Sequence, residues 1–178
     1  MGDTPELTIR DYLAEPETNI VSQQAVGGWR GQTSSGGFNA APDSFTFGSM
    51  RELGDRRVYA VTFATRAGAR MRVICHVRRA ATGDWRCEGV AGGGVGGDPH
   101  RGQPWVNFCG SYGREFYAGG QVLEHGGAVA RVRMVGANGY ALEDAPGEVD
   151  IVLFLADDPT HAAAGRVAGL RGQDPGEG

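Results

Sequence analysis

Lysine is absent from this chain of 178 residues, and all 17 of its basic residues are arginine. The arginines are scattered and the formal net charge is −4, whereas a nucleic-acid-binding domain presents a basic patch or stripe. We attribute the missing lysine to a GC-rich genome, in which lysine codons are rare, rather than to an arginine-built phosphate site. Nucleic acid is therefore not an expected partner.

Long hydrophobic runs are also absent. No stretch approaches the roughly 20 apolar residues that a membrane-spanning helix needs. The segment Met1–Glu6 is polar and acidic, unlike a signal peptide, and it lacks the Ser or Thr of a myristoylation site. We therefore expect a cytoplasmic protein without membrane contact, although a chain whose leader had been removed would look the same.

Cysteine is scarce, with three residues and no C-x-x-C pair. Cys87, His100 and Cys109 offer sulfur and nitrogen ligands of the kind zinc accepts, but no fourth ligand is evident. We favour a buried free Cys75, with Cys87 and Cys109 either free or bridged. Under oxidising conditions we expect the bridge to join Cys87 to Cys109, because the segment between them lets their Cα atoms approach to about 5.5–6 Å. In a reducing cytoplasm both thiols stay free.

Glycine is abundant, at 31 residues, and one group of glycines matches a known motif. Gly92-x-Gly94-x-x-Gly97 fits the dinucleotide fingerprint, which joins a strand to a helix that holds the pyrophosphate. The segment Asp98–Gly102 follows, and no amphipathic helix comes after it. We expect an accidental match and no cofactor.

The segment Cys109–Gly113 sets two nucleophiles among small residues. It lacks the glycine two positions before Ser111 that a nucleophile elbow requires. A cysteine or serine nucleophile also needs a nearby base, and no histidine is singled out by its position; the four are His76, His100, His125 and His161. We predict a structural turn here.

Two acidic pairs lie at the ends of expected strands, Glu143-Asp144 and Asp157-Asp158. Neither has the spacing of a calcium-binding loop, so we expect solvated turns. We expect the aromatic residues to pack in the core or between sheets rather than to form a ligand platform; these are Trp85, Trp105, Tyr112, Phe116 and Tyr117. No catalytic, cofactor-binding or metal-binding residue is therefore assigned.

Alternating patterns of apolar residues predict β-strands. In Arg70–Arg78, Met71, Val73, Cys75 and Val77 share one face, which predicts a half-buried strand. Val58–Thr65 alternates in the same way, and the short linker between the two contains Gly68, which tolerates φ > 0. These two strands therefore form a hairpin, and Asp84–Gly89 returns beside them with Trp85 and Cys87 on one face.

A second block repeats this pattern. Alternation at Ala130–Met134 and a return at Tyr140–Glu143 enclose Asn138-Gly139, a strong hairpin signal. Glu148–Ala156 is apolar on both faces, which predicts a central strand. Gly165–Arg171 is a plausible last strand.

The N-terminal region has weaker patterns. Thr4 and Pro5 suit the N-cap and first position of a short helix, although Leu7 and Ile9 equally suit a strand. Gly27–Ala41 and Val90–Pro104 have the composition of long loops. We expect an irregular N-terminal arm over residues 1–44, a β domain over 45–173 and a frayed tail over 174–178.

The order of these elements between Tyr59 and Asp174 resembles uncharacterised immunoglobulin-like β-sandwich modules of bacteria with GC-rich genomes. It is carried by Ala60–Arg79, the Trp85-Arg86-Cys87 return, the glycine-rich loop, Glu115–Gly120, Val129–Arg133, Val149–Leu155 and Gly165–Asp174. The resemblance implies a sandwich and no activity.

The expected fold is all-β, an antiparallel sandwich of about seven to nine strands with an irregular N-terminal arm. The expected function is that of a non-enzymatic module that binds or assembles with other proteins. The alternatives are a small enzyme with a loop-assembled Cys/His or carboxylate site, and a structural subunit of a larger particle.

Overall fold

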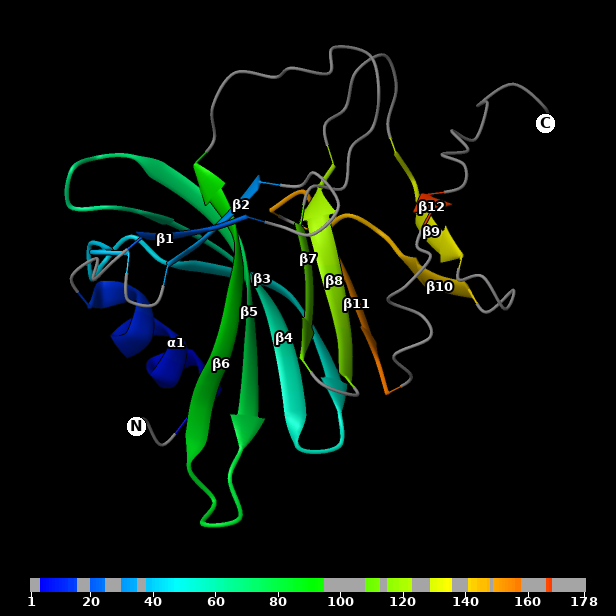
Figure 1. The fold of residues 1–178 in the computed structure, drawn as a ribbon, viewed down its shortest axis with the longest axis horizontal. Helices are drawn as coiled ribbons and strands as arrows, with labels where there is room; N and C mark the ends of the chain where they lie inside the picture. The colour runs from blue at the N-terminus through cyan, green and yellow to red at the C-terminus, as the bar shows by residue number, and fades with distance from the viewer. Residues whose placement is uncertain are drawn as a thin grey trace.

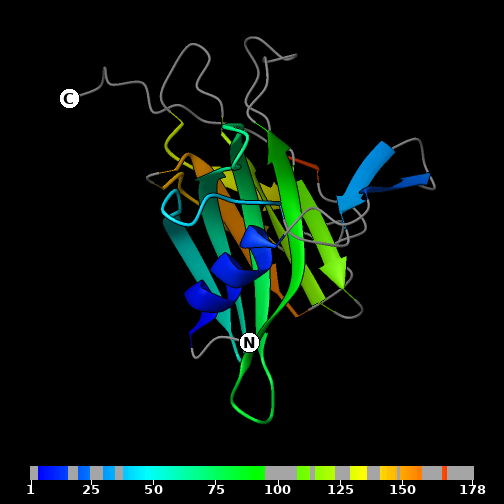
Figure 2. The same cartoon turned by 90° about the vertical axis from the view of Figure 1, so that its left-hand side faces the viewer.

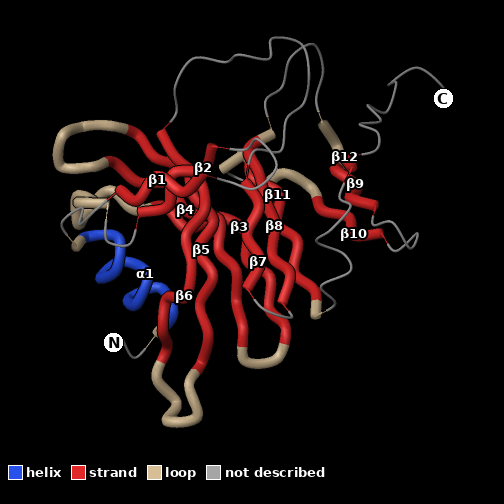
Figure 3. The backbone as a smooth tube through the Cα atoms, viewed as in Figure 1, coloured by secondary structure: helices blue, strands red, loops and turns tan. Residues whose placement is uncertain are grey.

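A computed structural model describes residues 4–15, 20–24, 30–34, 38–94, 108–112, 115–122, 129–135, 141–147, 149–157 and 166–167. These residues form one α-helix and twelve β-strands (Figures 1 and 3). Every strand pairing among them is antiparallel. The all-β class expected from the sequence is confirmed.

The elements in chain order are α1 (Pro5–Ala14), β1 (Ile20–Gln24), β2 (Arg30–Ser34), β3 (Thr46–Leu53), β4 (Arg56–Ala64), β5 (Arg70–Arg79), β6 (Trp85–Gly94), β7 (Phe108–Tyr112), β8 (Glu115–Gln121), β9 (Val132–Val135), β10 (Ala141–Asp144), β11 (Ile151–Ala156) and β12 (Arg166–Val167).

The described strands make four sheets. The largest has the order β3-β4-β5-β6; the others are β11-β8-β7, β10-β9-β12 and β1-β2. The largest sheet is a meander, in which neighbours in the chain are neighbours in the sheet. An immunoglobulin sheet has the order ABED, so this sheet does not support the immunoglobulin-like part of the expectation.

The β4–β5 hairpin is confirmed. Thr62 pairs with Arg72 in this ladder, and Gly68 in the connecting turn has φ of +86°. The expectation that β5 is half-buried is wrong, because Ile74 and His76 on its second face are as fully buried as Val73 on its first. A strand that is polar at its ends on one face is here covered on both.

The reason is a layered arrangement. One face of β3–β6 packs on α1, and the other packs on β8 and β11, with Val58 and Ile74 against Ile151 and Leu153 (Figure 2). The far face of β8 and β11 packs in turn on β9 and β10, which lie on the opposite side of the molecule from α1 in Figure 1. Three clusters of buried side chains thus separate four layers of the described chain.

Helix α1 begins as the sequence predicts. The Thr4 hydroxyl accepts a hydrogen bond from the Leu7 amide, and Pro5 occupies the first turn. Ile9 and Leu13 are fully buried against the sheet. The irregular arm expected over residues 1–44 is therefore wrong for Pro5–Ala14, because its i, i+4 apolar pair supplies part of the core. It is also wrong for β1 and β2, which form an antiparallel pair, and β2 lies within the loop expected over Gly27–Ala41. The predicted tail over 174–178 lies outside the described residues.

Helix α1, the helix of the described residues, lacks the length and apolar character needed to cross a membrane.

Strand β6 is longer than predicted. It continues to Gly94, whose partner is Met71 of β5, so the loop expected over Val90–Pro104 is wrong for its first five residues. Val90 packs against the α1 core, which gives the strand an apolar contact beyond the predicted end at Gly89.

The strands after residue 129 agree with the prediction in part. β9 and β10 pair as expected; the Asn138-Gly139 turn lies outside the described residues. β12 covers two residues of the expected strand over Gly165–Arg171. β11 is buried on both faces, as predicted, but it lies at an edge of its sheet rather than at the predicted central position. Neighbouring layers of the chain cover both of its faces.

Candidate functional site

A β-bulge in β6 shapes the space between the two largest sheets. His76 and Val77 are adjacent in β5, but their partners in β6 are Gly89 and Cys87. Glu88 is therefore the extra residue. A bulge re-aims side chains, and this one brings both Glu88 and Gly89 to the side that faces β8.

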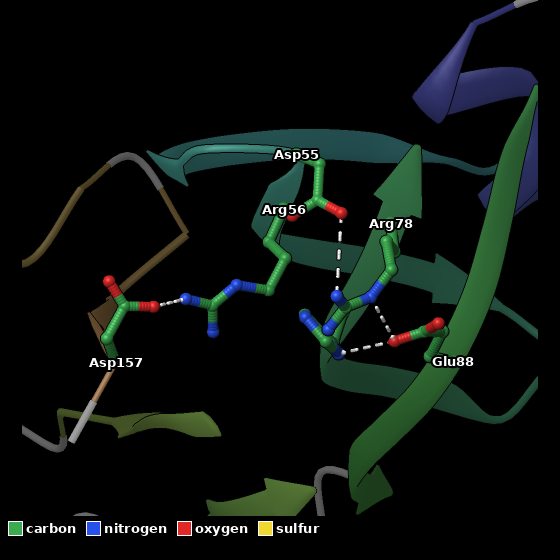
Figure 4. A network of polar contacts seen from close by, with 6 residues as sticks. Asp55, Arg56, Arg78, Glu88 and Asp157 are labelled. Carbon is green, nitrogen blue, oxygen red and sulfur yellow. Dashed lines mark hydrogen bonds and ion pairs between the residues drawn. The ribbon is translucent and has the colours of Figure 1, made fainter. Parts of the chain in front are cut away.

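Glu88 joins a polar cluster there. Its Oε2 accepts a hydrogen bond from Arg78 Nε at 3.1 Å and lies 3.8 Å from Nδ1 of the fully buried His76. Arg78 Nη1 also lies 3.4 Å from Asp55 Oδ2 in the β3–β4 turn. Figure 4 shows Arg78 between these two carboxylates. Two strands and one turn of the same sheet thus converge on this point.

Tyr117 of β8 meets the cluster from the second sheet. Its ring stacks on the His76 imidazole, with centroids 4.7 Å apart. A methyl group built on Gly89 would lie 2.5 Å from the Tyr117 hydroxyl oxygen, so the glycine makes room for this phenol. Burial, followed by the thiols of Cys87 and Cys75 and the carboxylate of Glu88, raises the pKa of Tyr117 to about 12. The phenol is therefore neutral at physiological pH.

Arg56 makes the second polar link between the sheets. Its side chain is 4% exposed and pairs with Asp157, just beyond β11 (Figure 4). Arg56 also lies directly opposite Arg78 in the β4–β5 ladder, and like charges in that position destabilise a sheet. The carboxylates of Asp55, Glu88 and Asp157 offset this repulsion.

Chemically, this cluster holds two sheets together around an imidazole. The Glu88 carboxylate lies on the Nδ1 side of His76, where a carboxylate orients a catalytic base, but at 3.8 Å it is beyond hydrogen-bond distance. A catalytic role would need substrate to reach His76, and the exposed fraction of that side chain is 0%. The geometry is that of a structural network with His76 buried at its centre and the side chains of Arg78, Glu88 and Asp55 partly exposed.

The acidic pair that ends β10, Glu143-Asp144, differs in part from the expected solvated turn. Asp144 is buried; its carboxylate accepts hydrogen bonds from the amides of Leu153 at 2.6 Å and Ala145 at 2.9 Å. It also pairs with Arg51 of β3. The expectation is therefore wrong for Asp144, which ties β10 to β11 and β3.

Glu143 fits the expectation, because its side chain is 45% exposed and loosely paired, at 3.5 and 3.6 Å, with Arg131 and Arg133. A shallow hollow of about 230 Å³ is lined by Arg131, Glu143, Asp144 and Ala145. Asp144 is already engaged by backbone amides, and the other charged groups are exposed, so a ligand would gain little here. Asp158 lies outside the described residues.

The buried thiol is confirmed. Cys75 is fully buried, and both Cys75 and Cys87 are free. Burial raises the pKa of Cys87 to about 12, so this thiol is protonated and unreactive at neutral pH. The side chain of Cys109 and all of His100 lie outside the described residues. The Cys87–Cys109 bridge therefore stays a prediction, to be tested by peptide mapping under non-reducing conditions.

The glycine motif is split between β6 and undescribed chain. Gly92 and Gly94 are paired with β5 residues inside the strand, and Gly97 lies outside the described residues. Gly92 has φ of +133°, and a Cβ there would approach the Arg72 carbonyl oxygen to 2.4 Å. This glycine is thus required by close strand packing, which gives it a structural reason.

Some of the remaining residues singled out in the sequence are described by the structure, and others are not. Trp85, Phe116 and Tyr117 are buried packing residues, as expected. His125, His161 and Trp105, and the side chains of Cys109–Tyr112, lie outside the described part of the chain. No group of three or more metal-ligating side chains occurs among the described residues.

An apolar surface lies where α1 borders β3. The large hydrophobic side chains that stand exposed in the described chain are Leu7 of α1 and Met50 of β3. Glu6 beside Leu7 accepts a hydrogen bond from the Tyr59 hydroxyl at 2.8 Å, and Tyr59 is the ladder partner of Met50. Met50 therefore lies beside the hydrogen bond that joins helix and sheet, and Leu7 lies on the outer face of the helix.

Two partly exposed rings extend this surface. Arg10 of α1 lies over Phe45 and Phe47, 5.1 and 5.4 Å from their centroids, and donates a hydrogen bond to the Pro42 carbonyl. We call Leu7, Phe45, Phe47 and Met50 the α1–β3 surface. A single exposed hydrophobic residue is ordinary, whereas a larger exposed apolar group is typical of an interaction site.

Sequence reasoning missed this surface. Leu7 is two residues before Ile9, so in a helix it lies on nearly the opposite face. The sequence shows this only if the segment is known to be a helix rather than a strand. Met50 comes directly after a bulge in β3. The bulge interrupts the alternation of side chains along the strand, so the sequence does not show on which face of the sheet Met50 lies.

No protein-family model, no curated protein and no solved structure matches this chain.

Proposed function

We propose that this protein is a non-enzymatic module that binds or assembles with other proteins, through the α1–β3 surface. The observation that carries the proposal is the exposure of Leu7 on α1 and Met50 on β3, 48% and 37%, with Leu7 next to Glu6 in the chain and Met50 next to Tyr59 in the sheet. Apolar side chains held on a rigid helix and strand lose little conformational freedom when a partner covers them.

The irregular edge strands of the largest sheet favour a partner that binds to a face of the sheet rather than to its edge. Strands β3 and β6, at the two edges, each carry a bulge. Bulges hinder strand addition from another chain. A partner that paired with the backbone would meet this irregularity, whereas one that docks side chains on the α1–β3 surface would not.

The test is site-specific photocrosslinking in cells that make the protein. A photoreactive residue is placed at position 50, and at position 131 as a control, where Arg131 is 75% exposed on another layer. Crosslinks to a protein at position 50 and not at position 131 are expected. Equal crosslinking at both positions, or none at position 50, would contradict the proposal.

The same experiment separates partner binding from assembly. If the crosslinked protein is another copy of this chain, light scattering should show an oligomer that Met50→Asp dissociates. That result would favour the structural subunit of a larger particle.

An enzyme is the second candidate, and the His76–Glu88 contact at 3.8 Å is the observation that favours it. Its discriminating test is labelling. A histidine-directed acylating reagent should modify His76 in the native protein if substrate can reach it, and should leave His76 unmodified if the cluster is structural.

We further propose that β3–β6 and β7, β8 and β11, seven strands in two facing sheets, form the sandwich expected from the sequence. The shared cluster that includes Val58, Ile74, Ile151 and Leu153 supports it.

A further inference from the structure

We infer that the β4–β5 turn, residues 65–70, binds a carboxylate-rich segment of a partner protein through Arg66 and Arg70. We call these two residues the turn arginines. This site is separate from the α1–β3 surface, and neither site needs the other. Its basis is a pair of exposed guanidinium groups on a rigid turn, both without a partner among the described residues.

Hydrogen bonds fix the backbone of this turn. The Thr65 amide donates to the Ala69 carbonyl at 2.8 Å, and the Ala69 amide donates to the Thr65 hydroxyl at 3.1 Å. The Arg66 amide donates to the carbonyl of Asn39, whose own amide donates to the carbonyl of Glu15 at the C-cap of α1. Because the turn is tied to the sheet and to the helix, little backbone freedom is lost when a partner binds to it.

The turn arginines differ from most arginines of the described chain. Elsewhere an arginine binds a carboxylate, an aromatic ring or a carbonyl oxygen, as Arg78 and Arg57 do. Every residue from 66 to 70 is exposed, and within the described part of the chain no hydrogen bond, ion pair or ring contact reaches either guanidinium of the turn. Arg86 also lacks such a contact, but it lies two residues after the exposed Asp84. The turn arginines therefore keep their charge available to a partner.

One short segment can reach both turn arginines. Arg70 is the ladder partner of Ala64, and Ala64 precedes Arg66 by two residues. Ladder partners have Cα atoms at most about 5.5 Å apart, and two residues of chain span at most about 7 Å. The Cα atoms of the turn arginines are therefore no more than about 13 Å apart. Two carboxylates a few residues apart in a partner can meet both, and each arginine can bind a carboxylate through two parallel hydrogen bonds.

Carboxylates of this chain border the turn but leave its arginines unpaired. Asp150 is 57% exposed and lies 3.9 Å from Nη2 of Arg72, and Glu15 and Asp43 are also exposed. Within the described chain, no ion pair joins any of these three acids to a turn arginine. With Arg72 and Arg10, the turn arginines keep the local balance of charge positive, whereas the whole chain has a net charge of −4.

This balance favours an acidic protein segment over nucleic acid. A nucleic-acid site neutralises several phosphates along a basic stripe, and here the acids that border the turn would repel the phosphates that follow. Two arginines suffice for two carboxylates. Charge complementarity of this kind speeds association and selects the partner.

The test titrates the full chain with two peptides of equal length, one in which glutamate alternates with glycine, the other with glutamine at every glutamate position. NMR signals of the arginine Nε–H groups report binding residue by residue. The glutamate peptide should shift the signals of Arg66 and Arg70 in a saturable manner, more than those of Arg79 and Arg86, with affinity that falls as salt is added. The glutamine peptide should leave them unchanged.

Matched variants separate this turn from the overall charge. Arg66→Gln with Arg70→Gln should weaken binding of the glutamate peptide about three- to tenfold, as expected for two exposed ion pairs. Arg79→Gln with Arg86→Gln makes the same change in net charge at exposed positions beside the β5–β6 turn, at the opposite end of β5 (Figure 1). This control should leave the affinity within about twofold. Thermal unfolding checks that both variants fold.

Equal shifts at the two pairs of arginines, or equal losses in the two double variants, would overturn the inference. A single-stranded oligonucleotide with as many charges as the glutamate peptide should bind more weakly; tighter binding would show that the partner class is wrong. Photocrosslinking at position 50 probes the α1–β3 surface alone, so its result stands whether or not the turn arginines bind carboxylates.

Discussion

His76 of β5 and Tyr117 of β8 stack at 4.7 Å with an angle of 19° between their rings, and this pair joins the two largest sheets through aromatic faces rather than aliphatic side chains. The stack depends on the bulge in β6, which turns Glu88 toward His76 and leaves Gly89 under the phenol hydroxyl. One extra residue in an edge strand thus brings a partly exposed carboxylate next to a fully buried imidazole.

The close approach of Gly89 to Tyr117 predicts a specific coupling. Gly89→Ala should lower the free energy of unfolding by about 1–3 kcal/mol, the usual cost of overpacking, because the Tyr117 ring is buried and the new methyl would stand 2.5 Å from its oxygen. In a Tyr117→Phe background the same change should cost less, since the oxygen is gone. Urea unfolding of the four proteins measures this; equal costs in both backgrounds would contradict the contact.

The packing of α1 predicts that it is part of the cooperative core. Leu13→Ala should lower the free energy of unfolding by about 2–5 kcal/mol, as for other buried leucines, because Leu13 is fully buried against the sheet. Leu7→Ala, a matched change on the exposed face, should stay within about 0.5 kcal/mol. If Leu13→Ala has no larger effect than Leu7→Ala, α1 is separable, as the sequence-based boundary at residue 44 implied.

The sequence predicted those elements whose signals are local. Alternation in Arg70–Arg78 and the glycine at position 68 were enough to place the β4–β5 hairpin, because period and turn chemistry act over a few residues. Thr4 and Pro5 likewise marked the start of α1. Whether this helix packs on the core depends on whether Ile9 and Leu13 contact the sheet, and these long-range contacts cannot be read from the local sequence.

The polar contacts depended on long-range placement and were not predictable. Nothing in the sequence distinguishes Asp144 from its neighbour Glu143, yet one is buried beneath β11 and the other is exposed. The bulge at Glu88 could not be predicted either, because Cys87–Val90 contains no residue typical of a bulge except one glycine. The face of Met50 was hidden for the same reason, because the bulge in β3 breaks the period from which a face is read.

Asp144 offers a clear test of that distinction. Asp144→Ala should lower the free energy of unfolding by about 2–4 kcal/mol, because it leaves the Leu153 amide, bound at 2.6 Å, without its acceptor in a buried site. Glu143→Ala removes only loose exposed pairs and should cost less than about 1 kcal/mol. Urea unfolding measures both. Similar costs at the two positions would mean that Asp144 does not join β10 to β11.

Three buried acids predict an alkaline limit to stability. Burial raises the pKa of Cys87 to about 12 from 9.0, and the pKa values of Tyr59 and Tyr117 to about 12 from 10.0. Because the folded pKa lies above the unfolded one, the neutral groups stabilise the fold fully below about pH 9, and this contribution is lost as the pH rises toward about 12. The melting temperature should therefore be level near neutrality and fall steadily above about pH 9.

Variants assign this fall to its groups. Tyr117→Phe and Cys87→Ala should each flatten the decline above about pH 9, relative to their own melting temperatures near neutrality, because each removes one group that the unfolded chain ionises first. Tyrosinate absorbance of the folded protein, compared with that of Tyr117→Phe, should place the difference well above the ordinary titration range of tyrosine. A decline unchanged in both variants, or a Tyr117 titration near its ordinary value of 10.0, would show that the phenol under Gly89 is open to water and that the two sheets do not close over it.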